Sequence, residues 1–192
     1  MVLPVWSPET CHHEAGHCVV TWYWGLPIYA VSLCPNNSQD PKNSGKVART
    51  DFEKVDPPPS MRQMVREMQA AIMPSGSIAE AIYTGQSVPE TLARSGAGDM
   101  DQMRAVESGT IDIPEAIRRA CWILTAPLIQ GAIKSLTSVL INEVVMGGDE
   151  VSRICRASLG RSRQHTWGHD KSSSQVSGIS EHKGNDGSPR VQ

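Results

Sequence analysis

Apolar residues recur at helical spacing along most of the chain, and this pattern predicts a mainly α-helical protein with a small β element. The first such segment runs from about residue 8 to residue 24. Ser7 is a favourable N-cap and Pro8 suits the first helical position, while Gly25 and Pro27 end the pattern. The apolar stripe of this helix consists of Ala15, Cys18, Val19 and Trp22. We expect the stripe to face the core.

A short strand is expected after this helix, because residues 28–33 alternate apolar and small side chains. Residues 35–45 are polar and rich in turn formers, and residues 46–50 could form a partner strand. The two strands would then make a small sheet beside the first helix.

Helical spacing resumes after a run of three prolines. Ser60 is a suitable N-cap for a methionine-rich helix over residues 60–73. A short helix over residues 77–84 is expected to end at Gly85. Residues 86–98 contain many small side chains and are expected to form a loop.

The remaining expected helices cover residues 99–107, 112–146 and 149–159. Pro127 should kink the long middle helix, because proline disrupts the backbone hydrogen bonds of a helix interior. Gly147 and Gly148 should end that helix, and Asp149 is a suitable N-cap for the last one.

The composition changes at Arg161, beyond which Ser, Gly, Lys, Arg and His dominate. Such a segment buries too little apolar surface to order itself. We therefore expect one folded domain over residues 1–160 and a disordered polar tail over residues 161–192. The tail contains His165 and His169, but a glycine lies between them and no glutamate accompanies them, which makes them a poor candidate metal site.

Composition narrows the classes of protein that need to be considered. The formal net charge of the 192 residues is −2, which gives no reason to expect nucleic acid or an anionic membrane as a partner. The five cysteines include no CxxC pair, and we expect reduced thiols in a cytoplasmic protein. No signal peptide is evident, and Gly25 and Pro27 interrupt the uncharged stretch from Cys18 to Pro35, so no membrane span is expected.

The candidate chemistry lies in the middle of the first helix, where His13, Glu14 and His17 form an HExxH motif. Helical residues four apart share a face, so both imidazoles could bind one metal ion, and zinc accepts neutral imidazole at about 2.0–2.1 Å. Glu14 could take a proton from a water molecule on that ion and later deliver it to a leaving amine. Cys11 and Cys18 do not share this helix face and are disfavoured as ligands.

A zinc-peptidase site normally has three protein ligands, so a third ligand must come from elsewhere in the chain. His12 cannot supply it, because it points about 100° away from His13 around the helix. The third ligand is therefore expected to be a carboxylate. The candidates are Glu80, Asp99 and Asp101.

Each candidate carboxylate also has a simpler interpretation. Glu80 could be a buried hydrogen-bonding partner, Asp101 a solvated helix charge and Asp99 a helix N-cap. Asp99 is favoured, because a preceding Ser-Gly-Ala-Gly run would let the backbone approach Gly16. A glycine in a helix interior indicates close contact with another element, which could carry the third ligand. Asp101 stays open as the alternative.

Four stretches, in this order, resemble the protease domain of the FtsH family, the AAA+ zinc metalloproteases. They are His13–Val20, Gly76–Gly85, Ser95–Met100 and Gly147–Val151. The resemblance implies a helical zinc-metallopeptidase domain with a small β element and endopeptidase activity. It also implies that His13, His17 and Asp99 bind zinc and that Glu14 is the catalytic base.

The chain also departs from the family pattern. The membrane anchor and ATPase domain of the family are absent from it, Ser77 stands where the family usually has arginine, and the aspartate segment is one residue shorter. We therefore expect a protease that cuts flexible protein or peptide segments or works with a separate AAA+ unfoldase. Assembly of identical subunits is a family expectation. A catalytically silent, zinc-stabilised binding or regulatory module, or a fragment of a larger protein, are the alternatives.

Overall fold

The computed structural model describes residues 6–33, 57–106, 111–143 and 145–159. The expected strand over residues 46–50 and the polar tail, including both of its histidines, lie outside the described residues. Within the described ranges the protein is mainly α-helical and has a two-stranded antiparallel sheet, as the sequence predicts.

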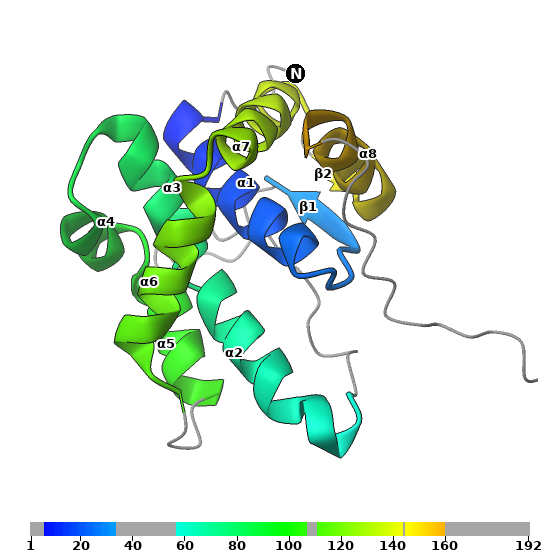
Figure 1. Cartoon of the computed structure of the whole chain (residues 1–192). Helices are drawn as coiled ribbons and strands as arrows, with labels where there is room; N and C mark the ends of the chain where they lie inside the picture. The colour runs from blue at the N-terminus through cyan, green and yellow to red at the C-terminus, as the bar shows by residue number, and fades with distance from the viewer. Residues whose placement is uncertain (1–5, 34–56, 107–110, 144, 160–192) are drawn as a thin grey trace, which may run out of the picture.

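Helix α1 (Pro8–Tyr23) lies in the middle of the fold and contacts α2, α3, α6, α7 and α8 (Figure 1). The side chain of Ser7 caps it by accepting a hydrogen bond from the backbone N–H of Thr10 at 3.2 Å. The predicted bounds of this helix are confirmed. Ala15, Cys18 and Val19 of its apolar stripe are buried in the main core, whereas Trp22 packs against that core and is partly exposed.

The closest neighbour of α1 is α3 (Ser75–Thr84). A Cβ atom added at Gly16 would lie 2.6 Å from Ala79 Cβ and 2.6 Å from the backbone oxygen of Ser75. Gly16 therefore marks a close helix–helix contact, as its position suggests. The expectation that Asp99 comes from the element beside Gly16 is wrong, because the contact is made by α3 and Asp99 lies on α5 (Ala97–Val106).

The segment over residues 86–98 is not the loop that its small side chains predict. It contains α4 (Val88–Arg94), which Ser87 caps by accepting a hydrogen bond from the N–H of Glu90. Serine, proline and glutamate at these positions are a helix start signal that outweighs the small residues. Gly85 ends α3 in the left-handed conformation with φ of +71°, as predicted.

The methionine-rich helix begins slightly later than expected. A short 3-10 turn (Pro59–Met61) precedes α2 (Arg62–Ile72), and no side chain caps that helix. Ser60 therefore lies inside the 3-10 turn and does not act as the N-cap.

The long helix expected over residues 112–146 is two helices, α6 (Ile113–Leu124) and α7 (Pro127–Leu140), which meet at an angle of 82°. The predicted kink is thus a complete break, with Pro127 in the first turn of α7. No single helix in the described ranges is long and apolar enough to cross a membrane. Taken together, α6 and α7 would be long and apolar enough, but they are bent sharply against each other.

The chain beyond α7 forms a strand where a helix was expected. Strand β2 (Val145–Gly147) pairs antiparallel with β1 (Ala30–Ser32), which is shorter than the predicted strand. Val31 and Met146 face each other in this ladder, and both are buried. The backbone N–H of Gly148 then donates to Tyr29 O at 2.9 Å as α8 (Gly148–Leu159) begins. The ladder gives the backbone of β2 hydrogen-bond partners on β1, and it places the side chain of Met146 in the core.

Candidate metal centre

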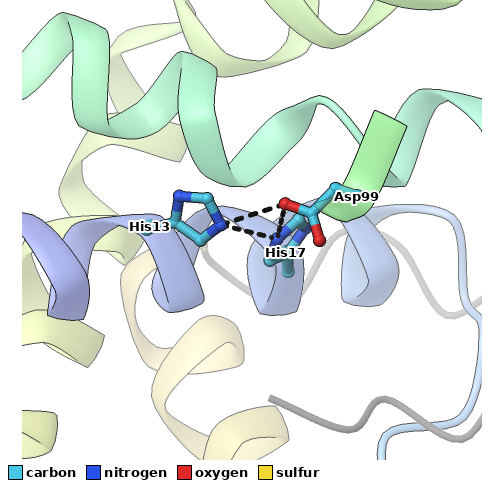
Figure 2. A group of neighbouring side chains, drawn as sticks. All are labelled: His13, His17 and Asp99. Carbon is cyan, nitrogen blue, oxygen red and sulfur yellow. Dashed lines mark hydrogen bonds and ion pairs between the residues drawn. The ribbon is translucent and has the colours of Figure 1, made fainter. Parts of the chain in front are cut away.

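Three side chains converge between α1 and α5 (Figure 2). Asp99 Oδ2 lies 3.2 Å from His13 Nε2 and 3.4 Å from His17 Nε2, and the two Nε2 atoms are 3.2 Å apart. One potential ligand atom from each residue lies within 4.8 Å of the others. This group could hold a metal ion, and it consists of the same three residues that the sequence analysis selects.

The donor set fits a metal of the zinc type. Two imidazole nitrogens and one carboxylate oxygen are ligands that zinc accepts, and three protein ligands are the number found in catalytic zinc sites. Among the described residues, no other group of His, Cys, Asp and Glu meets this condition. Cys11 and Cys18 are buried but lie outside the group.

Hydrogen bonds at the outer ring nitrogens orient both imidazoles. His13 Nδ1 donates to Glu80 Oε2 at 3.2 Å, and His17 Nδ1 donates to the backbone oxygen of Ile72 at 2.9 Å. With Nδ1 protonated in this way, Nε2 of each ring is the atom free to bind a metal. Ser75 Oγ also lies 3.3 Å from His17 Nδ1.

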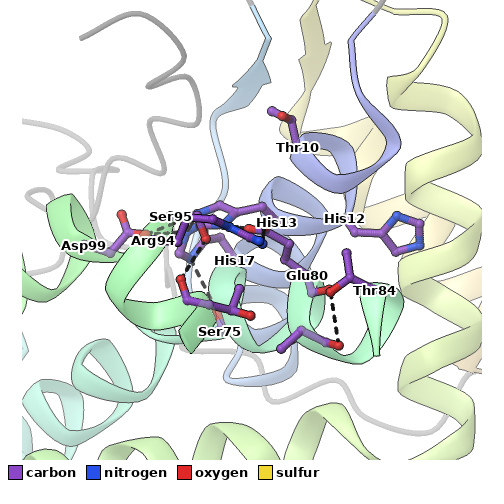
Figure 3. A network of polar contacts seen from close by, with 12 residues as sticks. Thr10, His12, His13, His17, Ser75, Glu80, Thr84, Arg94, Ser95 and Asp99 are labelled. Carbon is purple, nitrogen blue, oxygen red and sulfur yellow. Dashed lines mark hydrogen bonds and ion pairs between the residues drawn. The ribbon is translucent and has the colours of Figure 1, made fainter. Parts of the chain in front are cut away.

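Glu80 is itself held by Arg94, whose Nη2 donates to Glu80 Oε1 at 2.7 Å (Figure 3). The carboxylate is buried, whereas the arginine is half exposed. Burial opposes ionisation of Glu80, but hydrogen bonds from His13 and other donors lower its pKa to about 2. The simpler interpretation of Glu80, a buried hydrogen-bonding partner, agrees with these contacts. The sequence pattern gives no sign of this role of Arg94, because Arg94 lies on α4, in a segment whose small side chains predict a loop.

Glu14 is buried beside this group, with 5 % of its surface exposed. Burial raises its pKa, while the positive charges of His17 and His13 act in the opposite direction. Its Oε2 atom has no hydrogen-bond partner among the described residues. A buried carboxylate oxygen without a partner is costly, so this atom is available for a further ligand such as water.

Without a metal, the converging groups form an ion-pair network. Burial alone would lower the pKa of His13, but hydrogen bonds to Asp99 and Glu80 raise it to about 10. Burial likewise opposes protonation of His17, whose pKa is nevertheless raised by Asp99. The pKa of Asp99 is lowered by His17 and His13 against the effect of burial. The carboxylates of Asp99 and Glu80 thus favour positive charge at the two imidazoles, which is the charge that a bound cation would supply.

The other sequence candidates lie away from the converging atoms. The Asp101 side chain is 74 % exposed and pairs with Arg104 at 2.8 Å, as a solvated helix charge would. The ring of His12 stacks on Tyr83 with centroids 3.8 Å apart, and its Nδ1 donates to Pro8 O at 2.8 Å.

No known protein family model matches this chain, and no curated protein matches it. The resemblance to the FtsH family, which depends on four short stretches, therefore stays a prediction.

Proposed function

We propose that this protein is a zinc-dependent metalloendopeptidase. The observation that carries the proposal is the carboxylate of Glu14, which is buried beside the converging His13, His17 and Asp99 and has an oxygen that no described residue satisfies. An ion-binding site that served structure alone would need no such carboxylate. A proton acceptor next to three metal-type ligands is the arrangement that peptide hydrolysis by a metal requires.

His13 and His17 would hold zinc through Nε2, and Asp99 would hold it through a carboxylate oxygen. Bound zinc supplies a Lewis acid that polarises the scissile carbonyl and lowers the pKa of water. The protein's own contribution to this site is the fixed orientation of the ligands. Glu80 keeps the ring of His13 in place, and Arg94 in turn keeps Glu80 ionised and oriented.

Glu14 would move the proton in both halves of the reaction. Its carboxylate accepts a proton from the water that attacks the scissile carbonyl carbon, and it then donates that proton to the nitrogen of the leaving amine as the C–N bond breaks. Burial of Glu14 excludes bulk water from this exchange and strengthens its electrostatic interaction with the neighbouring charges.

Unfolded or flexible segments of proteins are the proposed substrates. The 192 residues contain no phosphate-binding-loop motif, so ATP-driven unfolding of a substrate is assigned to a separate protein. A separate AAA+ unfoldase and assembly of identical subunits are further parts of the proposal, and the resemblance to the FtsH family supports them. A cytoplasmic location is also proposed, and the five cysteines, which include no CxxC pair, support it.

A variant of Glu14 tests the proposal. Glu14→Gln should retain zinc content near that of the wild type, because Glu14 is outside the group of three ligands. Cleavage of an unfolded protein should fall by at least about a hundredfold, which is typical for loss of a general base. Glu9→Gln is the matched control, since Glu9 lies in the first turn of the same helix and outside the site.

If zinc-loaded Glu14→Gln cleaved the substrate at the rate of the wild type, the proposed chemistry would be refuted. If neither the wild type nor the variant cleaves protein while both bind zinc, the protein is a zinc-stabilised binding module. Loss of zinc in Glu14→Gln would show that Glu14 supports metal binding directly.

A further inference from the structure

The first turn of α3 lies directly against the two histidines of the metal centre. A Cβ atom added at Gly76 would lie 2.4 Å from His17 Nε2 and 2.6 Å from both Nε2 and Cδ2 of His13. Carbon atoms in contact normally stay about 3.5–4.0 Å from their neighbours. Any side chain at position 76 would therefore occupy the space in which the two Nε2 atoms converge.

The imidazoles cannot move aside without losing other interactions. The outer nitrogen of His17 is bonded to the backbone oxygen of Ile72, and the outer nitrogen of His13 is bonded to Glu80. Nor can α3 move away as a unit, since it is packed closely against α1 at Gly16. A larger residue at 76 would have to break one of these contacts.

Backbone conformation does not account for glycine at this position. Gly76 lies in the helical part of α3, and positive φ angles among the described residues occur at Gly25 and Gly85. Alanine is a better helix former than glycine, so helix propensity alone would favour a side chain here. The two imidazoles occupy the space that a side chain at position 76 would need, and this explains why the residue is glycine.

We propose that Gly76 is a positioning residue of the metal centre. The absence of a side chain at this position leaves the volume in which His13 and His17 bring their Nε2 atoms together. The consequence for metal affinity rests on the proposed zinc site, but the steric relation between Gly76 and the imidazoles does not require a metal.

The steric relation can be measured by a double-mutant cycle on the metal-free protein. Gly76→Ala should lower the melting temperature by several degrees in the wild-type background. In a His13→Ala/His17→Ala background the same substitution should cost nothing or raise the melting temperature, because the colliding rings are gone. The matched control is Gly131→Ala in α7, where an added Cβ meets no atom within 4 Å, and its effect should be the same in both backgrounds.

The cycle still tests the proposal if Gly76→Ala does not fold. Folding of Gly76→Ala that is restored by removing the two imidazoles would support the proposal as strongly as a recovered melting temperature. An equal loss of stability in both backgrounds would overturn it, because the collision would then involve some other group.

Zinc titration against a chromophoric chelator tests the consequence for metal binding. Gly76→Ala should bind zinc at least about tenfold more weakly than Gly131→Ala, a loss comparable to removing a residue that orients a ligand. Zinc affinity equal to that of the control would overturn the positioning role. If the wild type itself bound no zinc, the proposed function would fail, whereas the cycle would still decide the role of Gly76.

Discussion

Replacing each carboxylate around the two histidines tests which one binds the metal. Asp99→Ala removes an oxygen that lies 3.2 Å from His13 Nε2 and 3.4 Å from His17 Nε2, from a side chain that is 22 % exposed. The site would keep two of its three ligands. Since loss of an outer partner of a ligand typically costs about 10–100-fold in metal affinity, loss of the ligand itself should cost more than about a hundredfold.

The two other carboxylates give a graded comparison. Glu80→Gln removes the charge of the partner of His13 Nδ1, so its zinc affinity should fall within the range of about 10–100-fold. Asp101→Ala removes an exposed ion pair with Arg104, a type of interaction worth about 0–1 kcal/mol, and zinc affinity should stay within about threefold of the wild type.

The assay is competition for zinc with a chromophoric chelator at pH 7, and circular dichroism of each metal-free variant checks that it is folded. A larger loss in Asp101→Ala than in Asp99→Ala would refute the assignment and make Asp101 the ligand. Equal losses in Glu80→Gln and Asp99→Ala would refute the distinction between Asp99 as a ligand and Glu80 as the partner that orients His13.

Two further predictions concern the thiols and the tail. Burial raises the pKa of Cys11 to about 11, that of Cys155 to about 12 and those of Cys18 and Cys121 upward. Of these four thiols only Cys121 is partly exposed, so iodoacetamide at pH 8 should modify it before the other three, as read by mass spectrometry. Rapid labelling of all four in the native protein would contradict the buried packing. Ending the chain near Gly160 should leave zinc content and melting temperature almost unchanged, because the tail beyond it is predicted to be disordered. A large drop in melting temperature would show that the tail docks on the domain, and a loss of one zinc equivalent would show that its histidine pair binds metal.

Local sequence signals determine the element that carries the two histidines. The Ser7 cap and the helical spacing of apolar residues predict α1 correctly, because helix hydrogen bonds join residues only four apart. The same spacing puts His13 and His17 on one face before any tertiary contact is known. Gly85 likewise ends α3 through its own backbone conformation.

The sequence favours Asp99 as the third member of the site but leaves Asp101 open, and the tertiary structure decides between these two carboxylates. Asp99 and Asp101 belong to the same helix, and spacing alone leaves open which of them faces α1. The structure directs Asp99 toward the histidines and Asp101 into solvent, where it pairs with Arg104.

Only the tertiary structure shows which distant segments of the chain come into contact. Strand β2 forms because its backbone pairs with β1, which lies more than a hundred residues earlier in the chain. The local sequence pattern favours a helix there and gives no sign of this distant partner. The link from Arg94 through Glu80 to His13 joins three helices, and the fit of Gly76 against two imidazoles depends on how α3 packs on α1.

The sequence by itself determined which residues could bind a metal, since ligand chemistry and helical spacing are local properties. The tertiary structure decided which of them meet and what holds them in place, because those contacts depend on packing between elements that are far apart in the chain.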